Sequence, residues 1–104
     1  MEHAEVSLYQ VKVFQCVKAA NKWMTHADIA AACHVAGRTV REHTRRLVML
    51  GIFDQAEVFP RHAYRYSGQA EKRNKAYLLR LEDAAKVFAE LAVLSPTWAK
   101  ARER

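Results

Sequence analysis

The stretch that decides the fold is residues 25–53, which read THADIAAACHVAGRTVREHTRRLVMLGIF. Thr25 is a residue type that caps helices, and Asp28 follows three positions later, which is close to a capping box. An aspartate in the first turn also suits the positive start of a helix. We therefore expect a short helix over 25–33 with a compact apolar face.

A second helix is expected after a short break at 34–37. It runs from about Arg38 to Leu50, and Gly51 lies just past its end, where a glycine commonly stops a helix. At about 100° per residue, one side of this helix is suited to face the core. The residues on that side are Val40, Thr44 and Leu47.

The opposite side of this second helix is basic. It carries Arg38, Glu42, Arg45 and Met49, with Arg41 and Arg46 on its flanks. A helix fits the major groove of B-DNA, where arginine pairs with guanine or clamps phosphate. The plain alternative is a solvated helix face, because runs of charge often have no other role.

The flanking sequence predicts a mainly α fold with a small β-hairpin. The elements expected there are a helix over 5–20, strands at 52–59 and 63–67 around a turn at 60–62, and a long helix that starts between Ala70 and Lys75 and ends at Leu94. The order is helix, helix, turn, helix, hairpin, long helix. We expect one domain over 1–95, which includes the last helix at about 72–94, and a short basic tail at 96–104.

This pattern resembles the winged helix-turn-helix of small bacterial transcription regulators of the MarR-like and ArsR-like types. The residues that carry the resemblance are Asp28-Ile29-Ala30, Val35 in the turn, Arg38-Thr39-Val40-Arg41, and Leu47-Val48-Met49-Leu50-Gly51-Ile52. The hairpin corresponds to the wing. Two positions depart from the pattern. Ala36 stands where relatives often have a Ser or Thr that caps the second helix, so that Gly37 or the backbone must act as the cap here. Thr44 stands where Leu or Ile is usual.

The resemblance implies that the chain binds double-stranded DNA. Helix-turn-helix proteins read base edges with the start of the second helix, which makes Arg38, Thr39, Arg41, Glu42 and Arg45 the base-reading candidates and Arg46 a further contact. Glu42 either accepts a hydrogen bond from a cytosine amino group or pairs with Arg38 or Arg45. Thr25 and His26 begin the preceding helix, whose free amides suit phosphate. For His26, an ordinary surface histidine is the alternative.

The predicted wing adds three DNA-binding candidates. Arg61 and His62 lie in the expected tip and Arg65 lies on a strand. An ordinary exposed turn is the alternative, because turns commonly carry polar residues. Tyr64 and Tyr66 share one strand face, and we expect them to pack on the core rather than to stack on bases.

Two apolar stripes on the last helix predict a homodimer. One stripe can cover the domain's own core and leave the other for a partner helix, as small winged-helix regulators commonly do. The alternative is that both stripes belong to the core of one chain. The predicted dimer residues are Tyr77, Leu78, Leu81, Ala84, Ala85, Phe88, Leu91 and Ala92.

Composition agrees with a nucleic-acid partner. The chain has 17 Lys plus Arg against 11 Asp plus Glu, a formal charge of +6, which attracts polyanions. No apolar run suits a membrane span and no signal pattern opens the chain, so we expect a cytoplasmic, nucleoid-associated protein without a membrane partner. Cys16 and Cys33 are expected to be free thiols, with a disulfide as the alternative.

No catalytic signature is present in the sequence. It lacks a Gly-rich phosphate loop, a Gly-x-Ser-x-Gly elbow and clustered metal ligands, so we expect neither an enzyme nor a metal or other cofactor. The leading hypothesis is a homodimeric repressor that reads an inverted repeat. The alternatives are a DNA-binding protein of plasmid or phage partition, replication or excision, and a winged-helix module that binds proteins.

Overall fold

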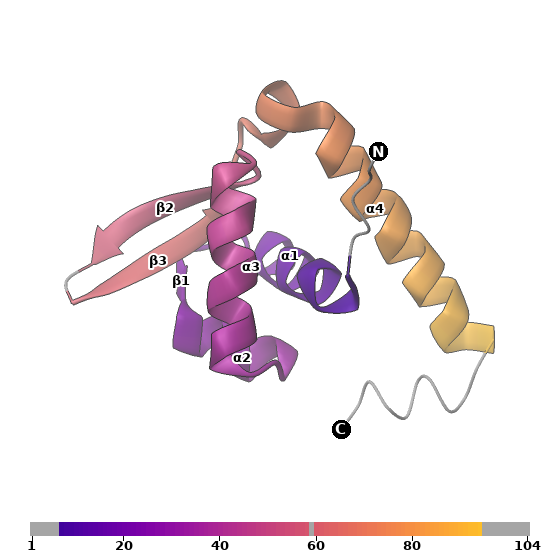
Figure 1. Ribbon diagram of the computed structural model, residues 1–104, viewed down its shortest axis with the longest axis horizontal. Helices are drawn as coiled ribbons and strands as arrows, with labels where there is room; N and C mark the ends of the chain where they lie inside the picture. The colour runs from indigo at the N-terminus through magenta and orange to yellow at the C-terminus, as the bar shows by residue number, and fades with distance from the viewer. Residues whose placement is uncertain (1–6, 59, 95–104) are drawn as a thin grey trace.

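A computed structural model describes residues 7–58 and 60–94. Within them the elements in chain order are α1 (Leu8–Ala20), β1 (Met24–Thr25), α2 (His26–Cys33), α3 (Gly37–Met49), β2 (Phe53–Val58), β3 (Arg61–Tyr66) and α4 (Ala70–Leu94) (Figure 1). The expectation of a mainly helical fold with a small hairpin is confirmed. The hairpin and α4 project from opposite sides of a body formed by α1, α2 and α3.

Local signals in the sequence explain the helix boundaries. The capping box of α2 is complete, because Thr25 Oγ1 accepts from the Asp28 N–H at 3.2 Å and Asp28 Oδ2 accepts from the Thr25 N–H at 3.0 Å. The backbone of α2 ends at His34 in the left-handed region, with φ of 56°. The α3 helix begins at Gly37, one residue earlier than expected, and Ala36 takes the N-cap position without a side-chain hydrogen bond.

The sheet has the strand order β1-β3-β2 and is antiparallel throughout. The two-residue strand β1 was not predicted, because so short a segment shows no periodicity. The hairpin turn is also tighter than predicted. Arg61 and His62 belong to β3 and pair with Val58 and Glu57, because the exposed end of a hairpin carries no alternation of burial to mark where pairing begins.

The core forms where α1, α2 and α3 meet the sheet and the first half of α4. Val40, Thr44 and Leu47 of α3 each have 0% exposure, which confirms the predicted inward side of this helix. Tyr64 is buried, and the Tyr66 ring contacts Phe14 edge-on at 6.1 Å between centroids. Both tyrosines therefore pack on the core, as expected.

The corner between α3 and β2 is held against the start of α4. Gly51 has φ of +85°, and a Cβ there would lie 2.8 Å from Arg73 Cβ, so no larger residue fits without strain. Asn74 has non-helical backbone angles, φ −158° and ψ 68°, which kink α4. Its Nδ2 donates to the Leu50 carbonyl at 3.1 Å, and its Oδ1 accepts from the Tyr77 N–H at 3.2 Å. The side chain of Asn74 thus links the end of α3 to the second segment of α4.

We predict that Asn74→Ala destabilises the fold by about 1–2 kcal/mol, because it removes a helix cap and a hydrogen bond to a helix end. Asn74→Ser keeps a side-chain acceptor for the Tyr77 N–H and loses the donor to Leu50 without placing an oxygen against that carbonyl, so its loss is expected to be smaller. Urea unfolding of the three proteins measures both differences. Equal stability of Asn74→Ala and the parent chain would contradict this assignment.

Candidate nucleic-acid interface

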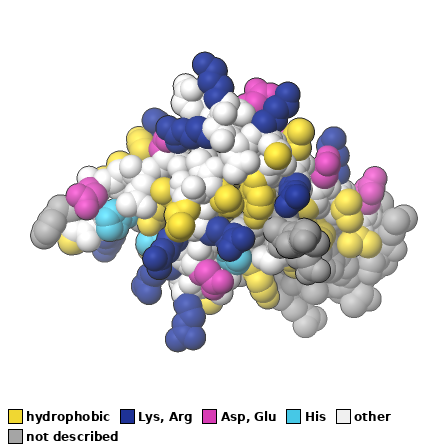
Figure 2. All heavy atoms as spheres, turned by 45° about the horizontal axis from the view of Figure 1, so that its top comes forward, with side chains coloured by type: hydrophobic (Ala, Val, Ile, Leu, Met, Phe, Trp, Pro, Cys, Tyr) yellow, Lys and Arg dark blue, Asp and Glu magenta, His cyan; other side chains and the backbone are white. Residues whose placement is uncertain are grey.

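The outward side of α3 is a basic surface beside the hairpin. Its exposed residues are Arg38, Arg41, Glu42, Arg45, Arg46 and Met49. Thr39 is half-buried at the start of the same helix. Figure 2 shows Lys and Arg side chains gathered on the face next to the hairpin. Because α3 begins without a side-chain cap, the amides of its first turn have no side-chain acceptor at Ala36.

A cleft separates the start of α2 and the side of α3 from the hairpin. It has two lobes with volumes of about 580 and 590 Å³. His26, Arg41 and His62 line both lobes. Glu42, Arg45, Gln55 and Tyr64 line the first, and Thr25, Ala27, Ala30, Gly37, Pro60 and Arg61 line the second. The structure thus brings together predicted site residues from three separate segments, and we call this space the α3–wing cleft.

His26, which lines the α3–wing cleft, belongs to a polar network centred on the buried Thr44. Thr44 Oγ1 donates to the Arg41 carbonyl at 3.1 Å, and His26 Nε2 lies 3.1 Å from the same hydroxyl. The His26 ring also packs on the Tyr64 ring, with 4.8 Å between centroids. Thr44 has 0% exposure, so its hydroxyl needs these partners, and they allow a threonine to occupy this buried position.

Burial and neighbouring charge both act on His26. Desolvation lowers the pKa of its imidazole, and the positive charges of Arg41 and His62 lower that pKa further. His62 also pairs with Glu57 across the hairpin, with 3.4 Å between Nε2 and Oε2. For Tyr64, burial raises the pKa of the phenol.

Arg65 is the one predicted wing residue that lies away from the α3–wing cleft. Its guanidinium carbon lies 4.3 Å from the Trp23 ring centroid, and its Nη2 lies 3.9 Å from Asp54 Oδ2. Successive side chains of a strand point to opposite faces, so Arg65 faces away from the side on which His62 and Tyr64 lie. Arg61 lines the cleft and is exposed.

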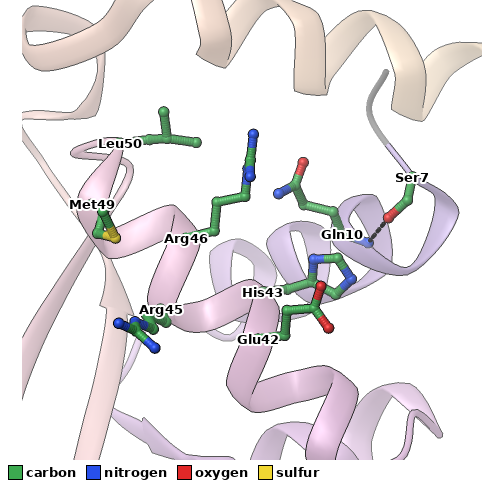
Figure 3. A pocket seen from close by; sticks show the side chains of 8 residues that line it. All are labelled: Ser7, Gln10, Glu42, His43, Arg45, Arg46, Met49 and Leu50. Carbon is green, nitrogen blue, oxygen red and sulfur yellow. Dashed lines mark hydrogen bonds between the residues drawn. The ribbon is translucent and has the colours of Figure 1, made fainter. Parts of the chain in front are cut away.

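A second hollow lies on the other flank of α3, between this helix and the start of α1. It has a volume of about 570 Å³ and is lined by Ser7, Gln10, Glu42, His43, Arg45, Arg46, Met49 and Leu50. Figure 3 shows Arg46, Gln10 and His43 turned toward this space and Arg45 pointing away from it. His43 Nδ1 is buried and has no hydrogen-bond partner within the described chain, and burial lowers the pKa of this histidine.

Several lining residues were not predicted from the sequence. Gln55 faces Tyr64 in the hairpin register, and that register was the signal that could have placed it at the α3–wing cleft. Gln10 is 3% exposed and accepts a hydrogen bond from the Tyr77 hydroxyl, a contact between residues far apart in the sequence. No spacing rule within one helix predicts such a pair.

The predicted dimer residues differ in burial along α4. Tyr77, Leu78 and Leu81 are 7%, 5% and 0% exposed in the single chain, so its own core already uses them. Ala84, Ala85 and Phe88 are partly buried against that core. Leu91 is 43% exposed, and the side chain of Ala92 lies outside the described residues. Among the predicted dimer residues whose side chains are described, Leu91 is therefore the one classed as exposed in the single chain.

The cysteines are both free thiols. Cys33 Sγ donates to the Ile29 carbonyl at 3.0 Å, and burial raises the pKa of its thiol to about 11. Among residues 7–58 and 60–94, no three side chains of His, Cys, Asp or Glu are grouped to hold a metal ion. The helices within those same ranges include none that is long and apolar enough to cross a membrane.

The helix-turn-helix followed by a hairpin defines the chain as a winged-helix protein. Solved structures share this fold with it. MepR, a transcription regulator of the Staphylococcus aureus multidrug efflux pump MepA, superposes with a TM-score of 0.56 at 17% identity, over 83% of this chain and 65% of that one. The adhesin competence repressor AdcR from Streptococcus pyogenes superposes with a TM-score of 0.54 at 12% identity, over 93% of this chain and 74% of that one.

A third solved structure extends the match over nearly the whole chain. The zinc-responsive MarR family member ZitR from Lactococcus lactis gives a TM-score of 0.52 at 12% identity, over 98% of this chain and 73% of that one. No family model matches the sequence, and no curated protein matches it. The chain spans about two thirds to four fifths of the length of the structures it matches. At these identities the likeness concerns the fold.

Proposed function

We propose that this chain is a sequence-specific double-stranded DNA-binding protein that regulates transcription and has no catalytic activity. The observation that carries the proposal is the continuity of the basic side of α3 with the α3–wing cleft. Side chains from α2, α3 and β3 converge there, although they are far apart in the sequence. If the basic side of α3 were only a solvated helix face, we would not expect His26 of α2 and Arg61 and His62 of β3 to lie beside it.

The geometry suits a helix placed in the major groove. The exposed arginines of α3 reach base edges from its first turns, and the hairpin then lies along the flanking backbone or the adjacent minor groove. Arg38, Thr39, Arg41, Glu42, Arg45 and Arg46 are the proposed contacts on α3, and Thr25, His26, Arg61 and His62 are those around the cleft. The solved structures with this fold include proteins described as regulators and a repressor, which supports the proposal.

We further propose a homodimer that represses by occluding a promoter. A two-fold dimer places one α3 in each of two major grooves about one helical turn, ~10 bp, apart, and so reads an inverted repeat. Val87 and Leu91 lie four residues apart on α4 and are 50% and 43% exposed. Positions with that spacing share one helix face, which gives a partner helix an apolar surface to cover.

Selection of bound sites from random duplex DNA tests the function as a whole. We expect enrichment of one site with two-fold symmetry, because the symmetry of the site mirrors that of the protein. Fluorescence anisotropy on the selected site then gives the affinity and its dependence on salt. Absence of binding to any duplex at low salt would overturn DNA binding and favour a module that binds an acidic protein.

We predict that Arg45→Ala reduces affinity for the selected site by about 1–3 kcal/mol and relaxes specificity at one base position. Arg45 is exposed on the outward side of α3, where a bidentate contact to guanine is possible. Anisotropy with site variants at that position measures both effects. Arg80→Ala, on α4 and outside the proposed interface, is the matched control and is expected to bind like the parent chain.

We predict that Arg61→Ala weakens binding to all sequences alike and lowers the slope of log affinity against log salt by about 1. The reason is that Arg61 lies at the hairpin end of the α3–wing cleft, where it meets phosphate rather than base edges. Titrations at several salt concentrations, on the selected site and on random duplex, measure the slope. A loss confined to the selected site would instead indicate that Arg61 reads bases.

We predict that Leu91→Glu raises the dimer dissociation constant about tenfold or more, because it places a carboxylate in a dry apolar interface. Analytical ultracentrifugation over a range of protein concentrations measures this constant. Lys72→Glu adds the same side chain at an exposed position about five turns earlier in α4 and is the control. A parent chain that is monomeric at all concentrations would contradict the dimer.

A further inference from the structure

The contacts of Thr44 favour one tautomer of His26. A threonine hydroxyl has a single hydrogen, and here it is donated to the Arg41 carbonyl. Thr44 Oγ1 then accepts toward His26, a role that matches the tautomer in which His26 Nε2 is the donor. Neutral His26 is then the tautomer with hydrogen on Nε2, and Nδ1 is left as the nitrogen that takes up a proton.

The groups that face His26 make its surroundings positive. Arg41 comes from α3 and His62 from β3, and both line the two lobes of the α3–wing cleft together with His26. The other charged or titratable groups around this cleft are Asp28 on α2, Glu42 and Arg45 on α3, Glu57 on β2, and Arg61 and Tyr64 on β3. Asp28 is engaged by its own helix cap and Glu57 by His62, and the exposed Glu42, which lines the first lobe, is not among the charges that shift the pKa of His26.

This arrangement offers a phosphate group complementary charge and hydrogen-bond donors. Arg41 supplies a fixed positive charge, and His62 supplies a ring N–H from the opposite wall. A phosphate in the cleft would provide the negative charge that His26 lacks there, and it would accept a hydrogen bond from a protonated Nδ1. The cleft lies beside the outward side of α3, along which DNA is proposed to lie.

We propose that His26 Nδ1 takes up one proton from solvent when a phosphate of the DNA backbone enters the α3–wing cleft, so that DNA binding strengthens as pH falls. The inference rests on the proposed DNA binding. The reaction converts a neutral imidazole to an imidazolium and consumes one proton for each subunit bound. The lowered pKa of free His26 agrees with this, because it keeps the ring neutral until the phosphate arrives.

The sign and size of the effect follow from linkage. DNA selects the protonated form, so affinity rises as pH falls through the window between the pKa of His26 in the free and the bound states. One proton changes the affinity per subunit by at most tenfold per pH unit within that window, and we expect a gain of about threefold per subunit between about pH 8 and about pH 6.5.

The test compares pH titrations of DNA affinity, at constant ionic strength, for the parent chain and three variants. His26→Gln keeps an amide N–H for Thr44 but cannot titrate, so its affinity is expected to be nearly independent of pH. His62→Gln is expected to bind DNA more weakly and to keep the pH dependence of affinity that the parent chain shows. His34→Asn is the matched control, because His34 is exposed at the end of α2 with φ of 56°, a conformation that asparagine tolerates.

Nuclear magnetic resonance of the His26 ring nitrogens gives a readout that does not need a variant to fold. We expect the tautomer with hydrogen on Nε2 in the free protein, and a rise of the His26 pKa when duplex DNA is added. Inorganic phosphate alone is a second arm, and a rise of that pKa with phosphate as with DNA would show that the site takes free phosphate too. It would leave the proton uptake intact.

Three outcomes separate this inference from the proposed function. Binding of DNA with an unchanged His26 pKa would overturn proton uptake and leave the function standing. A pH dependence that persists in His26→Gln and vanishes in His62→Gln would place the proton at His62 and overturn the assignment to His26. Absence of DNA binding at every pH would overturn the function itself.

Discussion

The buried hydroxyl of Thr44 is the constraint on which the arrangement of the motif depends. A hydroxyl with 0% exposure costs about 1–3 kcal/mol if its hydrogen-bonding groups are left unpaired, so its partners must be held in place. One partner is the backbone of α3 itself, a second is His26 at the start of α2, and the Tyr64 side chain also hydrogen-bonds to Thr44. His26 in turn packs on Tyr64 of β3. A single polar group thus sets the mutual positions of the three elements that carry the proposed interface.

A second junction fixes how this unit meets the long helix. Gly51 lets the chain turn sharply after α3, and the close approach of Arg73 fills the space that a side chain would need. Asn74 then bonds to the end of α3 and to the second segment of α4. The direction in which α4 leaves the body is therefore coupled to the end of the helix that bears the arginines.

Much of the fold could be predicted from local signals, and much of the candidate site could not. The capping box at Thr25 and Asp28, the inward side of α3 and the stop at Gly51 are properties of single segments, so spacing and residue type reveal them. The pairing of Arg61 with Val58 depends on register, and the contact of His26 with Thr44 depends on tertiary packing. The stripe on α4 was ambiguous for a related reason. Periodicity shows that Tyr77 and Leu81 are buried, but it does not show whether the same chain or a partner buries them.

The positive charge in the α3–wing cleft has two effects: it attracts a phosphate, and it disfavours protonation of His26. Arg41 attracts a phosphate by its charge and His62 offers it a ring N–H, while burial and the neighbouring charge of Arg41 disfavour the protonated form of His26 in the free protein. A lysine in place of His26 would stay charged in both states and would add its repulsion to the free protein at every pH. A histidine whose other nitrogen is committed to Thr44 adds its charge only when the phosphate is there to balance it. The polar residue at position 44 therefore does more than fill a core position. It contacts the His26 ring, whose charge we propose to depend on what the cleft contains.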